Sequence, residues 1–160
     1  PDTKEVLAEM EAAVKHVRQE GCKNVIWIQE MVTKDEAIQL YSHATVFCCP
    51  SIYEPFGIIN LEAMACRTAV VASAVGGIKE VVIDGVTGYL VPLEQLHVAP
   101  FEPVDPDVFS RDLAAAINKV LDDPQLADAM AAAGQKRARD VFSWASIAQQ
   151  TKDLYDSLLK

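Results

Sequence analysis

Two glutamates stand on either side of the point where a loop becomes a helix, and they are the first candidates for chemistry. Glu54 belongs to the loop 50–57, and Glu62 lies eight positions later, inside the helix that follows. The neighbours of Glu62 at helical spacing, Ile59 and Cys66, are apolar, and a carboxylate on the inward side of a helix needs a polar partner. A ligand hydroxyl would serve, and so would a salt bridge to a nearby basic residue. We expect both carboxylates to reach one ligand around one concave opening.

Glycines in two loops offer backbone groups to an anion. Gly57 ends the first loop where the helix begins, and the free N–H groups and dipole of a helix N-terminus attract phosphate. Gly76 and Gly77 follow an apolar run and permit a second close backbone approach. An ordinary strand-to-helix turn uses glycine in the same way, so it is the nearby glutamates that favour a ligand site.

Buried strands and short helices must position these loops. Continuous apolar runs at 45–49 and 69–73 predict strands buried on both faces, and 24–28 and 88–91 are predicted as further strands. Helical patterns run from Val6 until Gly21 ends the first, from Thr33 to about Ser42, over about 58–66, and around 78–83. This alternation predicts an α/β fold with a doubly wound, Rossmann-like parallel sheet. In such a sheet, ligands bind at the carboxyl ends of the strands.

The rest of the chain is expected to be helical. Prolines punctuate residues 93–106, which predicts a surface excursion. Helices are predicted at about 107–122, at 125–140, and from Ser143, a candidate N-cap, to the C-terminus. Only four strands are apparent, whereas a doubly wound sheet normally has five or six. We therefore expect the chain to begin inside a domain.

Composition argues against several classes of protein. Of the 160 residues, 51% are hydrophobic, which is too apolar for intrinsic disorder. With 14 basic and 23 acidic residues the net charge is −9, the opposite of a nucleic-acid-binding surface. No apolar run is long enough to cross a membrane, and no signal peptide is visible. The four cysteines form no CxxC pair, so we expect neither a zinc site nor a disulfide framework, and a cytoplasmic location.

Four motifs follow one another along the chain. They are Ser51-x-Tyr53-Glu54-Pro55-Phe56-Gly57, Asn60-Leu61-Glu62-Ala63-Met64-Ala65, Ala72-Ser73-x-x-Gly76-Gly77-x-x-Glu80-Val81-Val82 and Asp84-Gly85-x-Thr87-Gly88. Together they resemble the retaining glycosyltransferases of the GT-B fold, of the group 1 (family 4) type. Phe142-Ser143-Trp144 before the last helix is similar too. Within this family, Pro1-Asp2-Thr3 and residues 25–31 most resemble the glycogen synthases of actinobacterial type.

The resemblance implies a role for each glutamate. Glu54 would lie beside the donor sugar as the catalytic residue, and Glu62 would accept a hydrogen bond from the nucleotide ribose. Backbone amides at the start of the helix would meet the sugar and the diphosphate. The donor-binding residues would be Glu62, Phe56, Gly57, Ile58, Gly76 and Gly77, with no metal.

The resemblance also implies that residues 1–160 are part of the C-terminal, nucleotide-sugar-binding domain of a GT-B enzyme. The upstream strands, a basic pair that holds the diphosphate, and the acceptor domain would precede this segment, so the chain alone would be inactive. The whole enzyme would transfer glucose from ADP-glucose or UDP-glucose to an α-glucan in glycogen biosynthesis, with retention and without a cofactor. The alternatives are a lipid or small-molecule acceptor, or a nucleotide-sugar-binding module without turnover.

The strand order implied by the resemblance leaves a gap between 24–28 and 45–49. An unpaired strand edge is costly and attracts another chain. We therefore expect either that these two strands pair directly or that a second copy fills the gap and forms a dimer.

Overall fold

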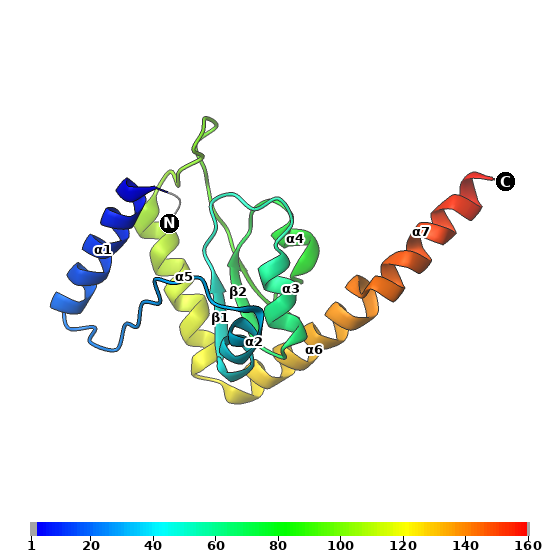
Figure 1. Ribbon diagram of the computed structural model, residues 1–160, viewed down its shortest axis with the longest axis horizontal. Coiled ribbons are helices and arrows are strands. Elements are labelled where there is room, and N and C mark those ends of the chain that lie inside the picture. The colour runs from blue at the N-terminus through cyan, green and yellow to red at the C-terminus, as the bar shows by residue number, and fades with distance from the viewer. Residues whose placement is uncertain (1–2, 160) are drawn as a thin grey trace. The chain divides into compact units, whose positions relative to one another are not determined.

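The computed structural model describes residues 3–159 and consists of two compact units, which divide between Thr33 and Lys34. The first unit holds helix α1 (Lys4–Gln19), drawn in dark blue in Figure 1. Thr3 caps this helix, because its hydroxyl oxygen accepts a hydrogen bond from the Val6 amide at 3.2 Å. The prediction of an opening helix is therefore confirmed.

Residues 24–28 form no strand in the described chain, so the prediction of a strand there is wrong. Strand backbone groups need a neighbouring strand as their partner, and α1 is the one regular element among the described residues of this unit. The Val25 carbonyl oxygen instead accepts hydrogen bonds from the Arg18 guanidinium at 2.7 and 3.1 Å. The sheet formed by the described residues accordingly contains no strand from 24–28.

The second unit is built on a parallel sheet. Its three strands in the described chain are β1 (Val46–Cys49), β2 (Ala69–Ser73) and β3 (Gly88–Val91), in the order β1-β2-β3. Every residue of β2 is buried, as a continuous apolar run predicts for a central parallel strand. Cys49 lies beside Ala72 and Ser73 beside Val91, so the carboxyl ends of the strands share one edge.

Helices cover both faces of this sheet (Figure 1). They are α2 (Lys34–His43), α3 (Ile58–Ala65), α4 (Ile78–Val81), α5 (Pro106–Leu121) and α6 (Pro124–Phe142). The last helix, α7 (Trp144–Leu158), packs against α6, and none of its described residues is buried. Val70 and Ala72 of β2 pack in one core with residues of α3 and α4. Val71 packs on the other face with Phe109 of α5 and Met130 of α6. The predicted doubly wound α/β architecture and its helices are thereby confirmed, and residues 93–105 form the predicted excursion.

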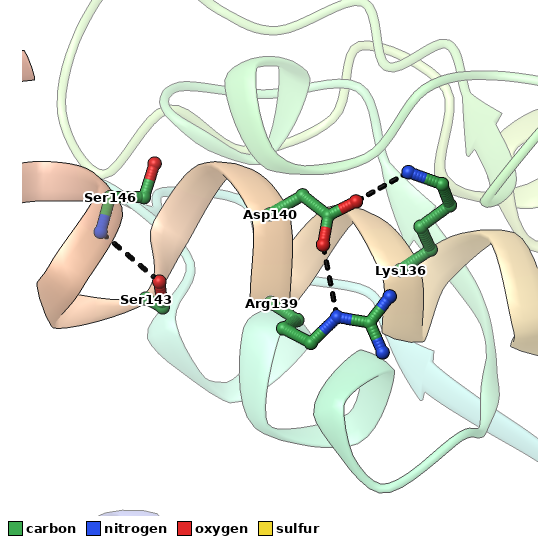
Figure 2. A network of polar contacts seen from close by, with 5 residues as sticks. All are labelled: Lys136, Arg139, Asp140, Ser143 and Ser146. Carbon is green, nitrogen blue, oxygen red and sulfur yellow. Dashed lines mark hydrogen bonds and ion pairs between the residues drawn. The ribbon is translucent and has the colours of Figure 1, made fainter.

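Polar contacts hold the end of α6 at its junction with α7 (Figure 2). The Asp140 carboxylate pairs with Lys136 one turn earlier and accepts from Arg139 at 2.9 Å. These two hydrogen bonds lower the pKa of Asp140 below its ordinary value. The Ser143 hydroxyl oxygen accepts from the Ser146 amide at 3.2 Å, so Ser143 caps α7 as the sequence predicts. Among the described residues, no helix combines the length and apolar character needed to cross a membrane.

Candidate functional site

Two loops at the carboxyl edge of the sheet pack backbone against backbone. The first, 50–57, follows β1, and the second, 74–77, follows β2. The Gly77 amide donates to the Glu54 carbonyl oxygen at 3.0 Å. A Cβ on Gly76 would overlap that same oxygen, and a Cβ on Gly77 would overlap the Pro55 carbonyl oxygen. The glycine pair does permit a close backbone approach, and the group that approaches is the loop carrying Glu54.

Glu54 accepts hydrogen bonds both with its side-chain carboxylate and with its backbone carbonyl oxygen. Its Oε1 accepts a hydrogen bond from the Gly57 amide at 3.0 Å, at the start of α3. Gly57 has φ of 99°, in the left-handed region that favours glycine. The helix N-terminus also favours a negative charge at this position. An amide that the sequence suggested for a ligand anion is therefore occupied by the Glu54 carboxylate.

A serine of β2 fixes the beginning of the same loop. The buried Ser73 hydroxyl lies within hydrogen-bond distance of the Ser51 carbonyl oxygen, and 3.3 Å from the Cys49 carbonyl oxygen. On the other side of the loop, the Gln95 side chain donates to the Ile52 carbonyl oxygen at 2.5 Å. Hydrogen bonds thus hold loop 50–57 from two directions.

Glu62 has a different environment on the exposed side of α3. The Tyr41 hydroxyl of α2 donates to Glu62 Oε2 in a long hydrogen bond of 3.5 Å. The pKa of Tyr41 is raised, first by burial of the phenol and then by the Glu62 charge. Of the two partners expected for Glu62, the basic residue is not found among the described residues, where a tyrosine contacts the carboxylate instead.

The structure distributes the predicted site residues over two cavities. A cavity of about 200 Å³ is lined by Ile52, Tyr53, Glu54, Val75, Gly76, Gln95 and Phe101. A larger one of about 820 Å³ lies between α3 and the α6–α7 junction, and its lining includes Phe56, Ile58, Leu61, Glu62, Arg139 and Phe142. Gly57 and Gly77 are buried where the loops meet. Glu54 and Glu62 therefore line different cavities in the described chain, and their shared contact with one ligand stays a prediction.

Three residues near the site escape sequence reasoning. Tyr41 contacts Glu62, Gln95 contacts Ile52 and Phe101 contacts Tyr53, from 21 to 48 positions away in the sequence. Such long-range contacts leave no local pattern in the sequence. The proline-rich composition of 93–106 was the one available signal, and it indicated only that the segment leaves the core.

The comparisons with known proteins agree with one another. Residues 8–98, more than half of the chain, match the protein family described as Glycosyl transferases group 1. The alpha-maltose-1-phosphate synthase of Mycolicibacterium smegmatis is 46% identical over 155 residues, which are 97% of this chain and 38% of that protein. The glycogen synthase of Mycobacterium tuberculosis is 38% identical over 120 residues, 75% of this chain and 26% of that protein.

A solved structure shares the fold. The crystal structure of Anabaena HepE in complex with UDP-glucose is 27% identical, with a TM-score of 0.71 over 92% of this chain and 36% of that one. The chain thus spans less than two fifths of the length of each of these proteins.

Proposed function

We propose, on the premise that this chain belongs to the glycosyl transferases group 1 family, that it forms the nucleotide-sugar-binding part of a longer retaining glucosyltransferase. The observation that carries the proposal is the loop 50–57, which presents Glu54 at the N-terminus of α3 and at the carboxyl edge of a parallel sheet. In α/β sheets this edge is where ligands bind. Residues upstream of this segment would supply the acceptor side of the site.

The proposed reaction moves a glucosyl group between two oxygen atoms. The bond between the anomeric carbon of the donor and its diphosphate oxygen breaks, and a bond forms between that carbon and an acceptor hydroxyl oxygen on the same face. The hydroxyl proton leaves with the nucleoside diphosphate. Charge on the leaving diphosphate would be stabilised by the N-terminus of α3. Because Glu54 already occupies the Gly57 amide, the diphosphate would use other amides of that turn or displace the carboxylate.

The two glutamates would act at different parts of the donor. Glu54 would accept hydrogen bonds from the transferring sugar, where positive charge develops in the transition state. Glu62 would accept from the ribose hydroxyls, since its carboxylate is exposed and, among the described residues, is held by the long contact to Tyr41 alone. The donor is proposed to be ADP-glucose or UDP-glucose, and the HepE complex with UDP-glucose supports a donor of this class.

For the acceptor, the relatives favour a phosphorylated glucose over an α-glucan. The product in the printed name, α-maltose 1-phosphate, contains two glucose units and one phosphate, so glucosyl transfer to glucose 1-phosphate would form it. That relative matches more of this chain, at higher identity, than the glycogen synthase does. An α-glucan acceptor and a role in glycogen biosynthesis are the second candidate, which the glycogen synthase match supports.

A transfer assay on the full-length protein tests the proposal. ADP-, UDP- and GDP-glucose are each combined with glucose 1-phosphate, maltose or glycogen, and nucleoside diphosphate release is followed together with the NMR spectrum of the product. We expect release only with an acceptor present, and an α-configured product. Donor binding without transfer to any acceptor would instead support a nucleotide-sugar-binding module, and the absence of both would refute the assignment.

A further inference from the structure

The excursion over residues 93–105, called the strap below, is folded rather than loose. Its two arms are joined by hydrogen bonds from the Leu96 amide to the Glu102 carbonyl oxygen and from the Val104 amide to the Glu94 carbonyl oxygen, both at 2.9 Å. Gln95 also pairs with Pro103 in an antiparallel bridge. A segment whose own conformation is fixed by hydrogen bonds in this way can hold a neighbouring loop in place.

Gln95 joins the strap to the loop that carries Glu54. Its side-chain nitrogen donates to the Ile52 carbonyl oxygen at 2.5 Å and to the Phe101 carbonyl oxygen at 2.8 Å. A primary amide has two N–H donors, so one nitrogen serves both acceptors. The first acceptor lies two residues before Glu54, and the second lies at the tip of the strap.

An aromatic contact joins the same two segments a second time. The rings of Tyr53 and Phe101 are stacked, with centroids 6.2 Å apart and an angle of 17° between their planes. Tyr53 immediately precedes Glu54, and both rings line the cavity of about 200 Å³ together with Glu54 and Gln95. The strap therefore forms one wall of a cavity that Glu54, the candidate catalytic residue, also lines.

The contacts of Glu54 itself depend on the placement of this loop. Its carbonyl oxygen receives the Gly77 amide, and its carboxylate receives the Gly57 amide, both at 3.0 Å. These contacts lie after Ile52 in the chain, whereas the Gln95 hydrogen bond fixes the position just before Glu54. Releasing Ile52 would free the loop to move while the sheet and its core stay intact.

We propose that Gln95 is a positioning residue, which fixes the Glu54 carboxylate by tying loop 50–57 to the strap. This inference rests on the proposed function, because it gives Glu54 its place beside the transferring sugar. Gln95 bonds to the Ile52 carbonyl oxygen, two residues before Glu54, so we expect it to act on the turnover step rather than on the binding of the nucleotide. Small displacements of a reacting group are costly, since a shift of about 1 Å can reduce the rate roughly a hundredfold.

The test uses three variants of the full-length protein. Gln95→Leu removes both donors at similar size, Gln95→Lys keeps a donor, and Glu94→Gln is the matched control at an exposed neighbouring position. We expect Gln95→Leu to lower kcat by roughly tenfold or more while the KM for the sugar nucleotide changes less than about twofold. Gln95→Lys should recover most of kcat, and Glu94→Gln should match the wild type.

Amide hydrogen exchange gives a readout that needs no activity. In Gln95→Leu the Gly57 and Gly77 amides, which bond to Glu54, should exchange faster, while the Gly85 amide, bonded to Gly88 at 2.8 Å, should not change. Unchanged kcat and unchanged exchange would overturn the proposal, and so would faster exchange at Gly85, which would indicate general destabilisation. If the wild-type protein transfers no sugar, the proposed function fails, and exchange at Gly57 and Gly77 alone decides the role of Gln95.

Discussion

Glu54 and Glu62 differ in what holds each carboxylate. Glu54 is half-buried and takes a backbone amide at the start of α3, so its position is set by the helix that it caps. Glu62 is exposed, and in the part of the chain that the structure describes its carboxylate has a single long contact, to the Tyr41 hydroxyl, so a ligand hydroxyl could displace that contact at little cost. At the residue scale, the first glutamate is suited to a fixed position and the second to an exchangeable partner.

Substitution of Glu54 can separate its charge from its capping role. In Glu54→Gln the side-chain oxygen can still accept from the Gly57 amide, so the stability of the full-length protein should stay near that of the wild type. We expect turnover to fall by roughly a hundredfold, the usual effect of losing one group that stabilises transition-state charge. Glu54→Ala should lose turnover and also about 1 kcal/mol of stability with the cap. Kinetics and urea unfolding measure the two effects, and full activity in Glu54→Gln would exclude a role for the charge.

Substitution of Glu62 should affect donor binding more than turnover. Glu62→Ala is expected to weaken donor binding by about 1–3 kcal/mol, the range for a lost hydrogen bond to a charged group. Titration calorimetry with the nucleoside diphosphate measures this, and Tyr41→Phe is the control, because it removes the Tyr41–Glu62 contact and leaves the carboxylate. Equal affinity of Glu62→Ala and wild type for the nucleotide would show that Glu62 is structural.

The raised pKa of Tyr41 leads us to expect a loss of folding stability at alkaline pH. Burial, and then the Glu62 charge, raise the pKa of Tyr41 above its ordinary value of 10.0, so the folded state keeps this proton to higher pH than the unfolded state. The stabilisation that protonated Tyr41 gives to the folded state is therefore complete below about pH 10. It is lost as the pH rises through the pKa of Tyr41 in the folded state. Thermal unfolding between about pH 9 and pH 11 should show a smaller decline for Tyr41→Phe than for wild type. An identical decline in the two proteins would mean that other titrating groups control the alkaline loss of stability.

At the scale of elements, the two site loops depend on each other through the glycine pair. Gly77 has φ of −73°, which any residue can adopt, so its requirement for glycine comes from the crowded backbone of Pro55 and Phe56. Gly85 is the opposite case, with φ of 71° and open space around it. The sequence placed both glycines in turns. It could not show which position requires glycine because of crowding by neighbouring atoms and which requires it because of its backbone conformation.

These two glycines provide a matched pair of substitutions. Gly77→Ala should destabilise the protein by about 3 kcal/mol, because backbone atoms cannot move aside as a side chain would. Gly85→Ala should cost about 1 kcal/mol, the conformational term alone. Urea unfolding of both variants compares them. A smaller loss for Gly77→Ala than for Gly85→Ala would show that the loops can separate.

The cap of α7 predicts a local effect rather than a global one. No described residue of α7 is buried, and the helix leads away from the sheet (Figure 1). Loss of the Ser143 hydroxyl should cost about 1 kcal/mol of helix stability, seen as faster amide exchange in the first turn of α7 and little change in β2. Ser143→Asp, which keeps an acceptor oxygen, is the control. Equal exchange in Ser143→Ala and wild type would show that the cap is not needed.

At the scale of the whole molecule, local pattern predicted the elements well and their partners less well. The apolar run 69–73 predicted a strand buried on both faces, and the alternation of strands and helices predicted the doubly wound sheet that is found. That fold matches the C-terminal domain of GT-B glycosyltransferases, as the motifs implied. The segment 24–28 has an equally strand-like composition, but a strand requires a neighbour, and no sequence window contains that information.

The same reasoning explains the limits at the site. The spacing of glutamates and glycines identified loop 50–57 and the start of the following helix, because the geometry of a loop and of a helix start depends on residues that are close in the sequence. The Tyr41 contact and the Gln95 tie depend on how distant segments pack, so they emerged only from the structure. Glu54 and Glu62 line different cavities for a related reason: positions eight residues apart across a loop and a helix can face in different directions.

Residues 24–28 provide the last prediction, which concerns the proposed longer protein. Ile26 is 86% exposed and Ile28 is 48% exposed, an unusual state for β-branched residues in a run that reads as a strand. In the full-length protein we expect upstream strands to pair with this segment and bury both side chains. The amides of 25–28 should then exchange slowly in the full-length protein and quickly in the 1–160 chain, whereas those of β2 should be slow in both. Light scattering on the 1–160 chain is measured alongside, because slow exchange in a dimer would show that a second copy has taken the place of the upstream strands. Fast exchange at 25–28 in the full-length protein would show that this segment is a linker, and that the sheet is completed without it.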